Sequence, residues 1–212
     1  MRAFYGSTGP RAGAAYTMRP HPLPVGRMAL KSTVYKAELQ ISDMDRHYYA
    51  THALTLARHP SETEERLMVR LLAFALHADD ALAFGHGLSS DDEPDLWRKS
   101  LDGEIELWID LGQPDESRIR KASGRAREVV VVNYGGRSAD IWWDKHRAAL
   151  SRIDNLTVLD IDDATVGALV ALANRTMRLQ AMVQDGQFEL YGDGGSLTVE
   201  SRVRMAPAAR SH

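Results

Sequence analysis

The sequence contains no cysteine, so disulfide bonds and thiolate metal sites are both excluded. No apolar run approaches the ~20 residues that a membrane-spanning helix needs, and we expect no membrane association. The formal net charge is only −3, which gives no overall attraction to nucleic acid. Any contact with nucleic acid must therefore come from a local basic patch. The absence of cysteine fits a reducing cytoplasm, which is the localisation we expect.

The chain length and composition are those of one globular domain. The 212 residues suffice for a substantial core, since a domain averages roughly 150 residues. Residues 1–27 differ from the rest, because they are rich in Arg, Gly and Pro and contain no Asp or Glu. We interpret this segment as a disordered extension or as the result of a start codon assigned upstream of Met28, with a transit peptide as the alternative. We predict one domain over residues 28–207 and a tail over residues 208–212.

The spacing of apolar residues predicts a mixed α/β fold. Alternation favours strands near residues 31–39 and 47–57, followed by a helix with Ser61 as N-cap and Glu64 three residues later. Three short strands, a helix, a strand, a helix, a strand and a helix come next, and "DG" and "DGG" mark an antiparallel finish. We therefore predict a central mixed β-sheet flanked by helices, with extra antiparallel strands from both ends of the chain.

One predicted strand, "EIELWIDLG", carries carboxylates. Side chains alternate along a strand, so one face holds Ile105, Leu107, Ile109 and Leu111. The other face holds Glu104, Glu106, Trp108 and Asp110. Either this second face is solvated, or its acids belong to a site.

The residues after this strand favour a site. The strand ends directly at a predicted helix, and loop ends beside helix starts often form binding sites. Five basic residues lie on and after that helix, namely Arg118, Arg120, Lys121, Arg125 and Arg127. Acids beside a basic helix suit a hard cation such as Mg²⁺ together with a phosphodiester.

Several segments resemble the YaeQ family: "ARHPSETEERLMVRLLAFAL", "DDEP", "LWIDLGQPDESRIRKA", "IWW" and "RTMRLQAMVQDG". These segments occur in the same order, and the resemblance extends from Met28 to about Pro207. It implies a variant of the PD-(D/E)XK nuclease-like fold, with a core like that of restriction endonucleases. It implies no proven activity, because the family is largely uncharacterised.

The acids of the nuclease-like pattern can be carried over residue by residue. The first acid lies on the helix before the sheet, where Glu65 or Glu62 matches. The second lies at the start of a middle strand, where Asp95 of "PDLW" matches, and the third ends the next strand, where Asp110 matches. The resemblance thus implies that Glu65, Asp95 and Asp110 hold Mg²⁺ or Mn²⁺. We also expect Glu65 to face the packed side of its helix.

The lysine of that pattern is missing from its usual place. It normally follows the third acid by two residues, where this chain has Gly112. Some members of the wider superfamily carry it on a neighbouring helix, and Lys121 is our candidate for such a displaced lysine. It would stabilise negative charge that develops on the phosphate. A Lys121 that points away from Asp110 would weaken the catalytic interpretation.

Four further residues have either a role in the site or a structural role. Glu62 falls in the first turn of the predicted helix, where an acid interacts favourably with the helix dipole. Asp92 is either a solvated loop charge or a neighbour of the metal. Glu106 shares a strand face with the third acid and is a candidate ligand. His59 either caps local structure or acts as a phosphate contact or general base.

Three functions remain open at this point. The first is a metal-dependent nuclease or phosphodiesterase acting on nucleic acid, with Lys121 as the electrophilic partner. The second is a catalytically inactive protein of the same fold that binds nucleic acid or a protein partner in gene regulation. The third is a globular scaffold whose polar face only keeps it in solution.

Overall fold

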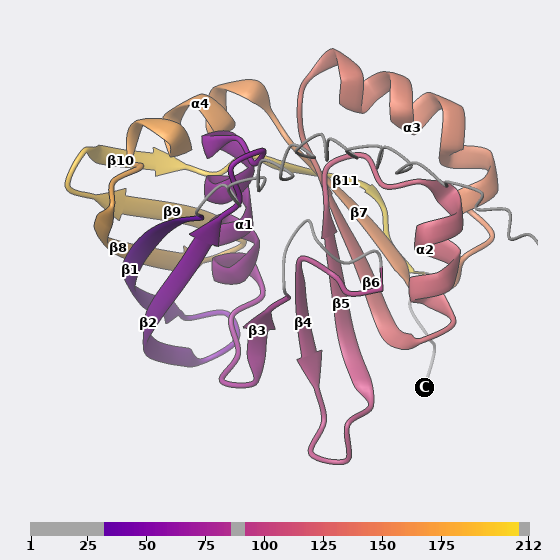
Figure 1. Ribbon diagram of the computed structural model, residues 1–212, viewed down its shortest axis with the longest axis horizontal. Coiled ribbons are helices and arrows are strands. Elements are labelled where there is room, and N and C mark those ends of the chain that lie inside the picture. The colour runs from indigo at the N-terminus through magenta and orange to yellow at the C-terminus, as the bar shows by residue number, and fades with distance from the viewer. Residues whose placement is uncertain (1–31, 86–91, 208–212) are drawn as a thin grey trace, which may run out of the picture. The chain divides into compact units, whose positions relative to one another are not determined.

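The computed structural model describes residues 32–85 and 92–207, which form two mixed β-sheets and four helices (Figure 1). The first sheet has the strand order β10-β9-β8-β1-β2 and joins strands from both ends of the chain. β1 runs parallel to β8, and the other neighbouring pairs are antiparallel. Its strands are β1 (Thr33–Asp43), β2 (Tyr48–Arg58), β8 (Thr176–Gln184), β9 (Gln187–Gly192) and β10 (Gly195–Thr198).

The second sheet has the order β11-β7-β6-β5-β4-β3. β5, β6 and β7 are parallel, so their carboxyl ends meet at one edge of the sheet. β4 pairs antiparallel with β5, and this brings the start of β4 beside the end of β5. The strands are β3 (Leu82–Phe84), β4 (Leu96–Lys99), β5 (Ile105–Leu111), β6 (Ala126–Asn133), β7 (Leu156–Ile161) and β11 (Ser201–Met205).

The helices bury both faces of the second sheet. α1 (Glu64–Leu76) is buried on all sides over residues 67–75 and contacts strands of both sheets. It shares the larger hydrophobic cluster with α4 (Asp163–Ala171). α2 (Glu116–Ser123) and α3 (Arg137–Leu150) supply a second cluster around Trp108 on the other face of β5 and β6. The two faces of β5 therefore look toward different helices, and neither is simply solvated.

The mixed fold and the order of its elements are as predicted, but the single central sheet is wrong. The strands from the two chain ends form a sheet of their own, through a parallel β1–β8 pairing where antiparallel strands were expected. The interpretations of residues 1–27 and of the tail fall outside the described residues. In the part of the chain that the structure describes, no helix has the length and apolarity to cross a membrane.

The start of α1 also differs from the prediction. Thr63, not Ser61, is the N-cap, and its side chain accepts a hydrogen bond from the Arg66 N–H (3.2 Å). Glu62 therefore precedes the helix and is buried, instead of lying in its first turn. Glu65 lies in that first turn and is exposed, so the expectation that it faces packed surface is wrong.

Candidate functional site

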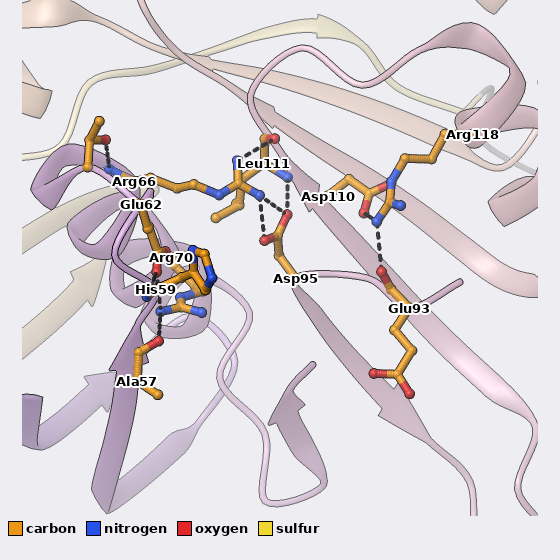
Figure 2. Close-up of polar contacts among 11 residues, drawn as sticks. Ala57, His59, Glu62, Arg66, Arg70, Glu93, Asp95, Asp110, Leu111 and Arg118 are labelled. Carbon is orange, nitrogen blue, oxygen red and sulfur yellow. Dashed lines mark hydrogen bonds and ion pairs between the residues drawn. The ribbon is translucent and has the colours of Figure 1, made fainter. Parts of the chain in front are cut away.

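Two buried aspartates lie where the start of β4 meets the end of β5. The Asp95 N–H donates to the Ile109 carbonyl (3.0 Å), which places Asp95 directly before β4, beside the strand that carries Asp110. Asp95 is 7% exposed and Asp110 only 1%. Figure 2 shows that their side chains meet different arginines, Arg66 and Arg118. Arg66 belongs to α1 and Arg118 to α2, so the two carboxylates are directed toward different helices, and neither arginine was foreseen.

Arg66 of α1 holds the Asp95 carboxylate. One guanidinium nitrogen, Nη2, donates to both carboxylate oxygens, at 2.6 and 2.8 Å, and Nη1 donates to the Leu111 carbonyl (3.1 Å). The Leu111 N–H also donates to Asp95 (2.9 Å), so backbone and side chain close one network (Figure 2). Burial lowers the pKa of Arg66, but the charge of Asp95, together with the contact with Tyr134, outweighs burial and raises the pKa above its ordinary value.

Arg118 of α2 holds the Asp110 carboxylate from the other side. Its Nε and Nη2 donate to the two oxygens in a fork, at 2.9 and 2.8 Å. This bidentate geometry is the strongest form of an arginine–carboxylate contact. Nη2 also donates to the Glu93 carbonyl (2.7 Å), which ties α2 to the segment before β4 (Figure 2).

A third arginine pair lies at the start of α1. Arg70 Nη2 donates to the Glu62 carboxylate (3.3 Å) and to the Ala57 carbonyl of β2 (3.2 Å). Both side chains are buried, and burial lowers the pKa of Arg70. The His59 N–H donates to Glu62 (3.2 Å), and the His59 ring bonds to Ser61 Oγ (2.6 Å). Glu62 and His59 thus both have local structural partners.

Three other predicted residues, Asp92, Glu106 and Lys121, lie in ion pairs. Lys121 pairs with Asp92 and not with Asp110, and both partners are largely exposed. Arg118, one turn earlier on α2, takes the place beside Asp110 that Lys121 was expected to take. Glu106 pairs with Arg98 of β4 (3.1 Å), and both side chains are partly exposed.

These placements do not suit a bound divalent cation. Each of the two buried carboxylates already has an arginine on both oxygens, and Glu65 is exposed. Over residues 32–85 and 92–207, no three His, Asp or Glu side chains gather in a group that could hold a metal ion. Metal ligation by Glu65, Asp95 and Asp110 accordingly stays a prediction that requires the arginines to move.

Sequence reasoning missed the three arginines that organise this region. Arg70 gave a usable signal, because a charged residue inside the apolar run of a buried helix needs a partner. Arg66 precedes Arg70 by one turn and therefore projects from a neighbouring part of α1. Arg118 gave no such signal, since it lies among several basic residues of a mostly polar helix.

A polar cavity of about 470 Å³ lies farther along, at the carboxyl ends of β6 and β7. On its wall, Asp160 accepts hydrogen bonds from Asn133 (3.0 Å) and from Arg204 of β11. Gly136, at the start of α3 with φ of 51°, lies against the Asp163 carboxylate at the start of α4. A Cβ atom on Gly136 would overlap that carboxylate, so the two helix starts are in direct contact.

Known proteins match this chain over most of its length. The family model described as YaeQ protein matches residues 28–201. Proteins of Escherichia coli strain K12 and Salmonella typhi, each described as uncharacterized protein YaeQ, are 45% identical over 181 residues. In both cases the match covers 85% of this chain and all of the relative.

Two crystal structures have the same fold. The YaeQ protein from Xanthomonas axonopodis pv. citri is 60% identical, with a TM-score of 0.80 over 84% of this chain and all of that one. The YaeQ protein from Pseudomonas syringae is 37% identical, with a TM-score of 0.79 over 82% of this chain and 97% of that one. The family match over residues 28–201 includes the strands and helices that carry the candidate site.

Proposed function

The chain belongs to the YaeQ family, and from this premise we propose that it is a catalytically inactive, nuclease-like protein that binds nucleic acid. The observation that carries the proposal is the pairing of Asp95 with Arg66 and of Asp110 with Arg118. A carboxylate that is already neutralised and fully hydrogen-bonded has little affinity left for a metal ion. In this proposal the two ion pairs hold α1 and α2 on the sheet, and the exposed basic side chains bind the nucleic acid.

The positions of the acids support the nuclease-like part of the proposal. α1 precedes the second sheet, Asp95 stands directly before β4, and Asp110 lies near the end of β5. This order is the one that the resemblance implies for the three motifs. An arginine pairs with each carboxylate, and Gly112 stands where the pattern has a lysine. Both features are what we expect of a protein that has the nuclease-like fold but does not catalyse hydrolysis.

The exposed cations on and after α2 are the proposed contact for phosphate groups. Arg120, Lys121 and Arg127 pair with Glu116, Asp92 and Glu104 respectively, and all six side chains are at least a third exposed. Exposed ion pairs contribute little to stability, so each cation can exchange its carboxylate for a phosphate. Binding of this kind depends on salt and has little sequence preference.

The test is fluorescence anisotropy with labelled single- and double-stranded DNA and RNA, over a salt series and with EDTA or Mg²⁺. We expect binding that weakens as salt rises, that survives EDTA, and that the Asp110→Asn variant retains. The double variant Lys121→Gln, Arg127→Gln should weaken binding at least several-fold. Arg178→Gln, an exposed arginine on β8, is the matched control and should bind as the unaltered protein does. Failure to bind any of the four nucleic acids at low salt overturns the proposal.

A metal-dependent phosphodiesterase is the second candidate, favoured by the positions of the acids along the chain, with Asp95 directly before β4 and Asp110 near the end of β5. Glu65, Asp95 and Asp110 would hold Mg²⁺ or Mn²⁺ if Arg66 and Arg118 turned away. Calorimetric titration of the protein with Mn²⁺ and Mg²⁺ distinguishes the two candidates. A site that disappears in the Asp110→Ala variant supports the enzyme, whereas no binding, or binding unchanged by that substitution, rejects it.

A further inference from the structure

The outer edge of β2 has unpaired backbone groups that could pair with another strand. β2 is the last strand of the first sheet, and within the described residues no strand pairs with its outer side (Figure 1). From Tyr48 to Ala57 it contains no charged residue, no proline and no glycine. Its pairing with β1 runs over eleven residues without a bulge. Charged side chains, proline and bulges are the usual means by which edge strands avoid pairing, and this edge has none of them.

The hydrogen bonds of β1 show which residues of β2 face outward. The Lys36 N–H donates to the Arg175 carbonyl at the start of β8, so Lys36 directs its backbone away from β2. Its partner on β2 is Thr55, which must then direct its own N–H and C=O away from β1. The Ala57 carbonyl, two residues on, accepts from Arg70 and so also points outward. Independent bonds on the two strands give the same assignment.

By the two-residue alternation of a strand, four residues present open backbone groups: Tyr49, Thr51, Ala53 and Thr55. Their side chains are all exposed on the open face of the sheet, and Tyr49 is 63% exposed. Each of the four offers one N–H and one C=O in a regular row. Arg70 occupies the next carbonyl, on Ala57, and thereby ends the open row at that point.

We propose that this edge pairs with the same edge of a second copy of the chain. In an antiparallel arrangement about a two-fold axis at His52, Tyr49 of each copy lies opposite Thr55 of the other, and Thr51 opposite Ala53. This register joins the open groups of all four residues on both copies and leaves the Ala57–Arg70 bond intact. The two five-stranded sheets then become one continuous sheet across the axis.

A second copy suits this edge because the strand is complementary to itself. An isologous contact brings identical surfaces together, so a charged edge would meet like charges and be repelled. The β2 segment from Tyr48 to Ala57 is uncharged, and Thr and Tyr are residues that favour strands. The contact involves one strand per copy and a small area, so we expect a reversible dimer.

Sedimentation velocity of the full chain, from roughly 1 to 200 μM, tests the proposal across the range of weak association. We expect a monomer that converts to a dimer as concentration rises. Ala53→Lys places two like charges near the axis and should leave only monomer. Ala53→Pro removes an outward N–H without breaking a bond to β1, and it should have the same effect.

Gln180→Lys is the matched control. It adds the same charge to the same exposed face, but on β8 in the interior of the sheet, and dimerisation should be unchanged. Amide hydrogen exchange gives a second readout, since Thr51, Ala53 and Thr55 should exchange more slowly as concentration rises. A chain that stays monomeric at the highest concentration, or a dimer that withstands both substitutions at Ala53, overturns the proposal.

Discussion

Asp95 and Asp110 both lie where the start of β4 meets the end of β5, and yet they are held in different ways. Asp95 has one arginine and one backbone N–H, and its arginine also grips the Leu111 carbonyl. Asp110 depends on the fork of Arg118, which comes from a helix of only eight residues. The side chain of Arg66 is 19% exposed and that of Arg118 is 26% exposed. Asp95 thus has one more protein contact, from the Leu111 N–H, and the less exposed arginine.

The two aspartate–arginine pairs therefore have different structural roles in the second sheet. The Asp95 pair ties the buried helix α1 to the end of β5, which belongs to the larger core. The Asp110 pair ties α2 to β5 and also to the segment before β4. We therefore expect the first pair to determine global stability and the second to determine how firmly α2 is seated.

Arg66→Met should have the largest effect, because it leaves the Asp95 carboxylate buried and unpaired. Removing one partner of a buried ion pair costs about 3–5 kcal/mol. Urea unfolding followed by circular dichroism measures this loss. Adding Asp95→Asn to the same chain should restore much of it, since no charge is then stranded. A loss below about 1 kcal/mol would show that water reaches Asp95 in this variant.

Arg118→Met should cost less, about 2–3 kcal/mol, because Arg118 is the more exposed of the two arginines and water can take its place beside Asp110. Amide exchange should report the loss mainly in α2, while α1 keeps its protection. Equal losses for the Arg66 and Arg118 variants, or faster exchange throughout the chain, would abolish the distinction between the two pairs.

His77, at the C-terminal end of α1, extends the comparison to a partly buried titratable group that has no carboxylate partner among the described residues. Burial, with the nearby charges of Arg46 and Arg98, lowers the pKa of His77 to about 4. The unfolded chain takes up this proton near pH 6.5, so stability falls as the pH drops from 6.5 toward 4. We expect a loss of about 1 kcal/mol between pH 7 and pH 5.5. His77→Gln should flatten that part of the stability curve, and an unchanged slope would contradict the assignment.

Lys121→Gln should have the smallest effect on folding. Lys121 and Asp92 form their pair in solvent, where such contacts add little stability. The midpoint of urea unfolding should stay within experimental error of that of the unaltered chain. A clear drop in the midpoint would mean that Lys121, and not only Arg118, helps to seat α2.

Periodicity located the helices and strands because it reflects burial within each segment. It could not choose between Ser61 and Thr63 as the start of α1, since both are good N-caps with an acid nearby. In the structure, Glu62 precedes α1 and accepts a hydrogen bond from Arg70 of that helix, which is consistent with a helix start at Thr63. Pairing between distant strands was equally out of reach. No local sequence pattern predicts that β8 pairs with β1, or that β11 pairs with β7 in the second sheet.

The site was predictable as far as the acids and no further. Asp95 and Asp110 were placed correctly at neighbouring strand ends, because strand order and alternation determine those positions. Which cation meets each acid depends on how α1 and α2 are rotated about their axes. A shift of one turn on α2 exchanges Lys121 for Arg118, and sequence spacing alone does not resolve that shift.

The contact between Gly136 and Asp163 has a consequence for how such chains diverge. Because a methyl group at position 136 would overlap the Asp163 carboxylate, that side chain would have to move, and the two positions are not free to change separately. In a set of related sequences, any larger residue at 136 should appear together with a shorter one at 163. Covariation between the two positions would therefore reflect the space that the Asp163 carboxylate occupies because Gly136 has no Cβ atom.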